Sequence, residues 1–219
     1  AGGSGLYVRA LTDDLDFPGT DPAVRTRLSE RAEREGAAAL HAELARLDPV
    51  AAERVEASNT RRIVRALEVI EITGRPFSAS LPRYEDIAPT VHIALRCERR
   101  LLDMRINERA RAMFDGGLVE EVEALIDQGI REGETAPRAI GYAQALAVID
   151  GTMSVPEAVD STALATRQLA SRQIKWFRRD PRLHWIDVAL TETGQCTDSE
   201  RSRLTRQAWE LVCARRGVA

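Results

Sequence analysis

The stretch from Thr166 to Arg179 separates charged and apolar side chains to opposite sides when it is placed on a helical wheel. Five cations share an arc of roughly 140°, and Gln168 lies among them. The cations are Arg167, Arg172, Lys175, Arg178 and Arg179. The opposite side carries Leu169, Ala170, Ile174, Trp176 and Phe177. This pattern predicts a helix that packs its apolar side on the protein core and leaves a basic side for an anionic partner.

No carboxylate interrupts this run of cations. Solvated helix surfaces usually pair acids with bases at i,i+4, because like charges at that spacing repel. The whole chain has 31 basic and 34 acidic residues and a net charge of −3, so only local clustering can indicate nucleic acid. The run favours a polyanion, and Gln168 could bond to bases or ribose. An ordinary solvated surface is the alternative.

Apolar spacing, caps and glycines divide the chain into mostly helical segments. Consecutive short helices are predicted over 21–74, capped by Asp21 and ended by Gly74. Strands are predicted at 90–96 and 184–188. Further helices are predicted over 7–14, 99–129 with a break near 116–117, 140–149, 154–179 and the C-terminal tail. Because two strands need partners, we expect the rest of a sheet to come from elsewhere in the protein.

The three cysteines have no zinc-ligand spacing, and no apolar run is long enough to span a bilayer. We therefore expect a cytoplasmic location, no membrane partner and no structural metal site. The chain opens on a glycine-rich turn at residues 2–5, and such turns usually follow a strand. We expect the sequence to belong to a longer protein, with about a hundred residues before Ala1.

A second basic group stands at 58–65, where Arg61, Arg62 and Arg65 begin a capped helix. A helix N-terminus is already electropositive, so cations placed there indicate an anion nearby. Arginines that cover a neighbouring helix are an equal alternative.

Arg105 and Arg109 lie one helical turn apart, a spacing that could hold one compact anion such as a diphosphate. Asp103 and Glu108 stand close by. On spacing alone, ordinary surface pairing is the favoured interpretation.

Two glycine turns could present polar groups to a ligand. The turn at 2–5 exposes Ser4 but lacks the Gly-Lys-Ser/Thr ending of a P-loop. In the turn at 138–144, Gly141 permits close backbone approach. Tyr142 and the glutamine two residues later could stack on or bond to a base. A tyrosine packed at a helix start is an equal alternative.

In order and spacing, these segments together resemble one family, the tRNA dimethylallyltransferases, also called isopentenyl-tRNA transferases. The resemblance covers about residues 1–188, and its specificity lies in the combination, since several pieces are ordinary singly. The matching pieces are Gly2–Tyr7, Asp21-Pro22 with Arg25, Arg61–Val69, Gly74–Pro76, Arg105-Ile106 with Arg109, Ala139–Tyr142, Ala165–Ala170, Arg172-Gln173 and Trp176-Phe177.

The resemblance implies an α/β fold: a P-loop-kinase-like core, truncated at the N-terminus and mostly helical in this chain, with an all-helical insertion. The core would comprise 1–20 and 89–190, the insertion 21–88, and 191–219 a linker and C-terminal helix. The implied reaction transfers a dimethylallyl group from dimethylallyl diphosphate to N6 of adenosine 37 in the tRNA anticodon arm. The adenine is flipped out of its stack, Mg²⁺ assists, and the enzyme is a monomer. An RNA-binding module without chemistry and a nucleotide-kinase relative are the alternatives.

Residue roles follow from the same resemblance. Ser4 lines the channel, where the family usually has threonine, while Arg105 and Arg109 meet the diphosphate. The family's P-loop and its aspartate base are absent from this sequence, so we expect the chain alone to be inactive. The implied tRNA contacts are Arg25, Arg61, Arg62, Ile63, Val64, Arg65, Arg138, Ala139, Ile140, Gly141, Tyr142, Gln144, Arg167, Gln168, Arg172 and Gln173.

Overall fold

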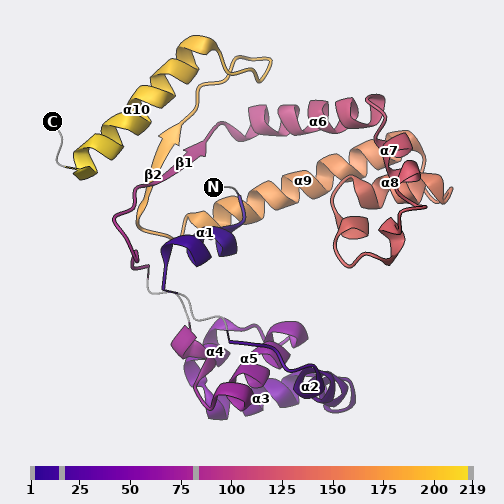
Figure 1. The fold of residues 1–219 in the computed structure, drawn as a ribbon, viewed down its shortest axis with the longest axis vertical. Helices are drawn as coiled ribbons and strands as arrows, with labels where there is room; N and C mark the ends of the chain where they lie inside the picture. The colour runs from indigo at the N-terminus through magenta and orange to yellow at the C-terminus, as the bar shows by residue number, and fades with distance from the viewer. Residues whose placement is uncertain (1–2, 15–17, 81–83, 217–219) are drawn as a thin grey trace. The chain divides into compact units, whose positions relative to one another are not determined.

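The chain divides into two compact units. Their structure, a computed structural model, describes residues 3–14, 18–80 and 84–216. The first, here called the helical unit, covers Leu6–Pro89. The second, here called the α/β unit, joins Gly3–Gly5 to the chain from Thr90 onward. Figure 1 labels the elements of both units.

The helical unit is built from short helices with well-formed ends. Asp21 caps α2 by accepting hydrogen bonds from the backbone N–H groups of Ala23 at 2.9 Å and Val24 at 3.2 Å. Gly74 ends α5 in the left-handed conformation, with φ of 65°. The predicted run of helices over 21–74 is therefore confirmed. The helices are α1 (Gly5–Thr12), α2 (Pro22–Glu35), α3 (Ala37–Leu47), α4 (Pro49–Arg54) and α5 (Thr60–Thr73), followed by the 3₁₀ turn η1 (Phe77–Ser80).

The core of the helical unit forms where α2 and α3 pack on α5. Leu40, Leu44 and Ile63 have no solvent exposure, and Leu28 is 2% exposed. The apolar side of α5 fills the space between the other helices because its buried residues recur at helical spacing. Burial of these side chains, each favourable by about 1.5–3 kcal/mol, holds the unit together.

Residues 6–14 make their contacts with the returning chain of the helical unit. The N–H of Ile87 donates to the carbonyl oxygen of Thr12 at 2.9 Å. The guanidinium of Arg9 lies 4.1 Å from the ring centroid of Tyr84. These contacts group residues 6–14 with the helical unit; the boundary at residue 21, which the resemblance implies, stays a prediction.

The α/β unit contains a two-stranded parallel sheet. Strand β1 (His92–Arg96) pairs with β2 (Leu183–Asp187), and His92 lies opposite Leu183. Arg96 and Asp187, which are also opposite each other, form an ion pair at 2.6 Å. Parallel neighbours require a long crossover, and the segment between the strands supplies it as helices. Both predicted strands are confirmed to within two residues.

The crossover helices form the body of the α/β unit. They are α6 (Arg99–Asp115), α7 (Leu118–Ala124), α8 (Tyr142–Ile149) and α9 (Val155–Phe177), with 3₁₀ turns η2 (Ile130–Glu132) and η3 (Ala136–Arg138), and α10 (Asp198–Arg216) follows β2. Helix α6 runs along α9, while α7 and α8 pack together at the end away from the strands (Figure 1). The predicted break at 116–117 is confirmed, since Gly117 has φ of 93°. Helix α7, however, ends five residues before the predicted end at 129, because Leu125–Gly129 form turns. None of the described helices has the length and hydropathy of a membrane span.

Candidate nucleic-acid interface

The exposed face of α9 carries cations that no carboxylate neutralises. Helix α6 packs Ile106 and Ala110 against Ala163, with Ala170 at the edge of this contact. The side of α9 that carries Arg172 and Lys175 is exposed. Within the described ranges, no ion pair reaches the cations on that side. We call Arg172 and Lys175 of α9, together with Arg178 and Arg179 of the turn that directly follows it, the α9 cations.

Arg167 differs from the α9 cations because α6 holds it in place. Its Nη1 donates to the side-chain oxygen of Asn107 on α6. Arg99, also on α6, donates to the Ser171 hydroxyl at 2.8 Å and to the carbonyl oxygen of Arg167 at 3.4 Å. Arg167 is half-buried, whereas Gln168 remains exposed. The two residues assigned together from the sequence thus occupy different surroundings.

The N-terminal glycine turn lies directly against α9. A Cβ at Gly3 would overlap the side chain of Gln173, and a Cβ at Gly5 would overlap the indole of Trp176. Ser4 lies between these two glycines and is exposed. The structure therefore places Ser4 in a turn whose neighbouring residue Gly3 lies against Gln173. Gln173 faces this turn and lies on the apolar side of α9, away from the α9 cations.

This packing predicts that Gly5→Ala detaches the turn from α9. An added methyl cannot fit against Trp176, and overpacking of this kind costs roughly 1–3 kcal/mol. We expect a red-shifted Trp176 emission, measured with Trp185 and Trp209 replaced by phenylalanine. Gly19→Ala is the matched control, because an added Cβ there meets no atom within 4 Å. An emission maximum that stays in place in Gly5→Ala would contradict the packing.

In the turn at 138–144, the polar side chains form hydrogen bonds with other residues of the α/β unit. The Tyr142 hydroxyl donates to the Glu121 carboxylate, which raises the pKa of Tyr142. Gln144 accepts from the N–H of Gly141 at 2.8 Å and donates to the Ser161 hydroxyl at 3.3 Å. This arrangement corresponds to the alternative of a tyrosine packed at a helix start. Of the other residues assigned here, Arg138 and Ala139 are exposed, and Ile140 is half-buried.

Arg105 and Arg109 are not paired in the way their spacing alone favours. Asp103 pairs instead with Arg99, at 2.9 Å. Arg105 Nη1 donates to the carbonyl oxygen of Gly194 at 2.8 Å, and Arg109 is exposed. Neither guanidinium meets a carboxylate in the part of the chain that the structure describes. The pair therefore keeps the charge that an anion would require.

The basic group at the start of α5 divides into exposed and buried residues. Arg61 and Arg62 are exposed and have no carboxylate partner among the described residues. Ile63 is fully buried and Val64 is 6% exposed, so both side chains belong to the core of the helical unit. Any contribution of these two residues to RNA binding would therefore act through the packing of α5.

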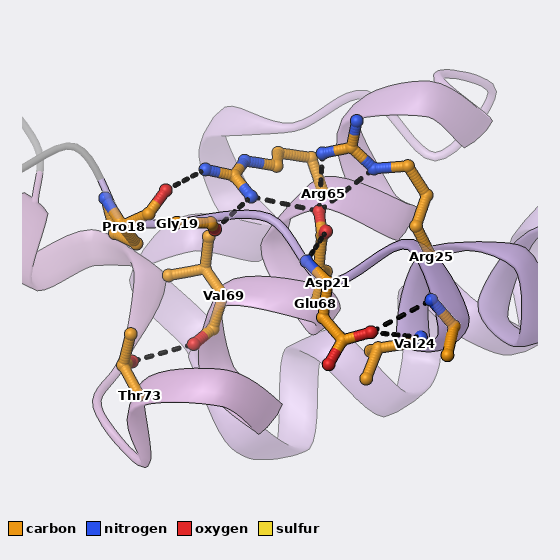
Figure 2. Close-up of polar contacts among 10 residues, drawn as sticks. Pro18, Gly19, Asp21, Val24, Arg25, Arg65, Glu68, Val69 and Thr73 are labelled. Atoms are coloured by element: carbon orange, nitrogen blue, oxygen red, sulfur yellow. Dashed lines mark hydrogen bonds and ion pairs between the residues drawn. The ribbon is translucent and has the colours of Figure 1, made fainter.

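Two arginines of the helical unit that the resemblance assigned to the tRNA share one buried carboxylate. The sequence alone did not predict this shared partner. Arg25 on α2 and Arg65 on α5 both bond to Glu68, at 2.6 and 2.9 Å (Figure 2). The Glu68 side chain has no solvent exposure. Its position three residues after Arg65 was the available signal, because residues at that spacing are neighbours on a helix.

The Mg²⁺ that the resemblance implies has no evident site in the described part of the chain. No group of three or more His, Cys, Asp or Glu side chains able to hold a metal lies together there. The carboxylates of the cluster in Figure 2 are already bonded to guanidinium or backbone N–H groups. The carboxylates of this cluster therefore have no free oxygen arrangement to offer a Mg²⁺ ion.

An exposed helix with unmatched cations, in a chain without net positive charge, is typical of proteins that bind polyanions through one local surface. The family model described as IPP transferase matches residues 1–180 of this chain. The chain therefore belongs to the IPP transferase family.

Curated relatives extend beyond this sequence. The tRNA dimethylallyltransferase of Streptomyces coelicolor is 51% identical over 211 residues, which cover 96% of this chain and 65% of that protein. The tRNA dimethylallyltransferase of Thermobifida fusca is 56% identical over 212 residues, covering 97% of this chain and 63% of that protein. The chain thus spans less than two thirds of the length of these relatives.

Solved structures share the fold. The tRNA isopentenylpyrophosphate transferase of Bacillus halodurans is 30% identical with a TM-score of 0.58, covering 98% of this chain and 66% of that one. A eukaryotic dimethylallyltransferase acting on tRNA gives a TM-score of 0.71 at 19% identity, covering 95% and 55%. The second likeness concerns the fold alone. A mostly helical chain with a small parallel sheet agrees with the expected α/β class.

Proposed function

We propose that this chain is the RNA-holding part of a tRNA dimethylallyltransferase whose α9 cations contact the phosphates of the anticodon arm. The observation that carries the proposal is the set of exposed, unmatched cations on α9, in a chain of the IPP transferase family. The identity of 51–56% to proteins named tRNA dimethylallyltransferase supports the same activity.

In the proposed reaction, N6 of adenosine 37 attacks C1 of dimethylallyl diphosphate. The N6–C1 bond forms, the C1–O bond breaks, and the diphosphate leaves with the electron pair. The N6 proton passes to a base, a role that we assign to none of the described residues. Mg²⁺ belongs to this proposal only as an aid to the leaving diphosphate.

Two sets of residues in the α/β unit fit supporting roles. Arg105 and Arg109 are exposed cations one helical turn apart, and we assign them to the diphosphate. Ser4, held by the glycines against α9, carries a hydroxyl that we assign to the adenine channel. We further propose a P-loop-kinase-like topology for the complete core, with a cytoplasmic monomer as the working form.

Salt dependence tests the proposed RNA contact. Binding of an anticodon stem-loop to the chain is measured by filter binding over a range of salt concentrations. Each neutralised phosphate adds about −0.7 to −0.9 to the slope of log K against log salt, so the four α9 cations alone predict a slope of about −3. A slope near zero would contradict the proposal, because phosphate contacts must release counterions.

A nucleotide-kinase relative is the second candidate, and the same assay separates it. Such a protein needs no contact with an anticodon arm, so it would bind a nucleotide but show no salt-dependent affinity for the stem-loop.

A further inference from the structure

Glu68 is a completely buried carboxylate in the helical unit. Burial of a charge is unfavourable unless hydrogen bonds and opposite charges compensate it. Three groups do so here: Arg25 of α2, Arg65 of α5 and the backbone N–H of Asp21, which donates to Glu68 Oε1 at 3.1 Å. All three lie around the carboxylate in Figure 2.

The two arginines use their donors differently. Arg65 Nη2 donates to the carbonyl oxygen of Pro18 at 2.6 Å, and its Nη1 donates to Gly19 at 3.1 Å as well as to Glu68. Both of its terminal nitrogens are therefore occupied by the protein.

Arg25 instead presents one edge of its guanidinium to the carboxylate. Its Nε and Nη2 donate to Glu68 Oε2 at 3.2 and 2.6 Å. Its Nη1 makes no hydrogen bond within the described residues, and its side chain is 46% exposed. The guanidinium is thus fixed along one edge while its other edge remains available.

The Glu68 carboxylate is held in its charged form by the groups around it. Burial raises the pKa of Glu68, but the hydrogen bonds from Arg25, Arg65 and Asp21 together hold that pKa below its ordinary value. Glu68 is therefore ionised at neutral pH. With the Asp21 carboxylate that caps α2, two carboxylates formally balance the two guanidinium groups, so the outward edge of Arg25, and no net charge of the cluster, is what an anion would meet.

We propose that Glu68 is a positioning residue that holds Arg25 ready for an RNA phosphate. The inference rests on the proposed function, since it assumes that the helical unit contacts the same RNA. An arginine that is already immobilised loses less rotamer entropy when it binds. Glu68 fixes the orientation of Arg25 through Nε and Nη2 and leaves the outward Nη1 uncovered.

The sign of one substitution separates positioning from simple electrostatics. Glu68→Gln removes a negative charge near the RNA, so through-space electrostatics alone predicts tighter binding. If Glu68 positions Arg25, the same change weakens binding. We expect Glu68→Gln to lower stem-loop affinity roughly fivefold, the loss that corresponds to one side chain that must be immobilised on binding.

The matched control lies on the same pair of helices. Glu71 of α5 pairs with Arg27 of α2, and both side chains are about half exposed. Glu71→Gln removes the same charge one turn along without touching Arg25. We expect its affinity to equal or exceed that of the unaltered chain.

A double-mutant comparison completes the test. We expect Arg25→Ala to weaken binding at least as much as Glu68→Gln, because it removes the contact itself, and the double variant to bind no more weakly than Arg25→Ala. Equal or tighter binding by folded Glu68→Gln, or additive losses, would overturn the inference.

If Glu68→Gln does not fold, Arg25→Lys becomes the test variant, because lysine keeps the charge but cannot hold the carboxylate through a fixed edge. Unchanged affinity in Arg25→Lys overturns the inference. If the unaltered chain shows no salt-dependent binding, the proposed function fails instead.

Discussion

Replacing Arg172, Lys175 and Arg179 together by alanine is expected to lower the affinity for an anticodon stem-loop by on the order of a hundredfold. The slope of log K against log salt should become shallower by about 2, since three phosphate contacts are lost. Thermal stability should change little, because the three side chains are exposed and have no ion-pair partner in the described chain. Filter binding and a thermal melt measure the two effects.

The control for this result is a triple variant of equal charge. Arg27, Arg34 and Arg131 are exposed, but each pairs with a carboxylate, at Glu71, Glu35 and Asp150. Their replacement by alanine removes the same three charges from surfaces that already balance them. We expect only a small loss of affinity. Equal losses of affinity in the two triple variants would show that RNA binding depends on the net charge of the chain and not on the position of the α9 cations.

Gly141→Ala is expected to destabilise the α/β unit by on the order of 3 kcal/mol. Gly141 has φ of 98° and ψ of −53°, a conformation that a residue with a Cβ rarely adopts. An added Cβ would also lie 3.1 Å from Met113 Cε and 3.4 Å from Leu118 Cδ2, and both belong to the core of α7 and α8. Backbone strain and side-chain crowding therefore both lower the stability of this variant.

Gly151→Ala is the comparison variant, with a positive φ but open space around the added Cβ. Gly151 also has a positive φ, of 68°, but an added Cβ there meets no atom within 4 Å. We expect its cost to be about 1 kcal/mol, the ordinary price of the left-handed conformation. Urea denaturation of both variants measures the difference. Similar midpoints for the two would mean that the space around Gly141 adjusts without cost.

The sequence predicted those parts of the fold that depend on local signals. Asp21 and Gly74 mark helix ends through a side-chain cap and a left-handed glycine, and the structure places them at those ends. The strand at 90–96 was evident from β-branched alternation and the one at 184–188 was predicted too, yet their parallel pairing was not, because pairing depends on contacts between residues distant in sequence. The turns at 125–129 escaped prediction because apolar spacing continues through them.

The candidate interface was predictable only as a charge pattern. A wheel identifies the cations of α9, but it does not show that α6 binds Arg167 through Asn107 and leaves Arg172 exposed. Nor can spacing reveal that Arg25 and Arg65 meet at one carboxylate, since Arg25 and Glu68 are 43 positions apart. Gln173 was assigned to the tRNA by the resemblance alone, and the close approach of Gly3 shows that it faces the N-terminal turn.

The parallel pairing of β1 with β2 also bears on how the chain folds. The two strands meet only after the whole crossover, α6 to α9, has been brought into a closed loop. The entropy of closing that loop must be overcome before any strand hydrogen bond compensates it. Helices in the helical unit meet partners that are closer in sequence. We therefore expect the strand pair to form later than the helix contacts of the helical unit.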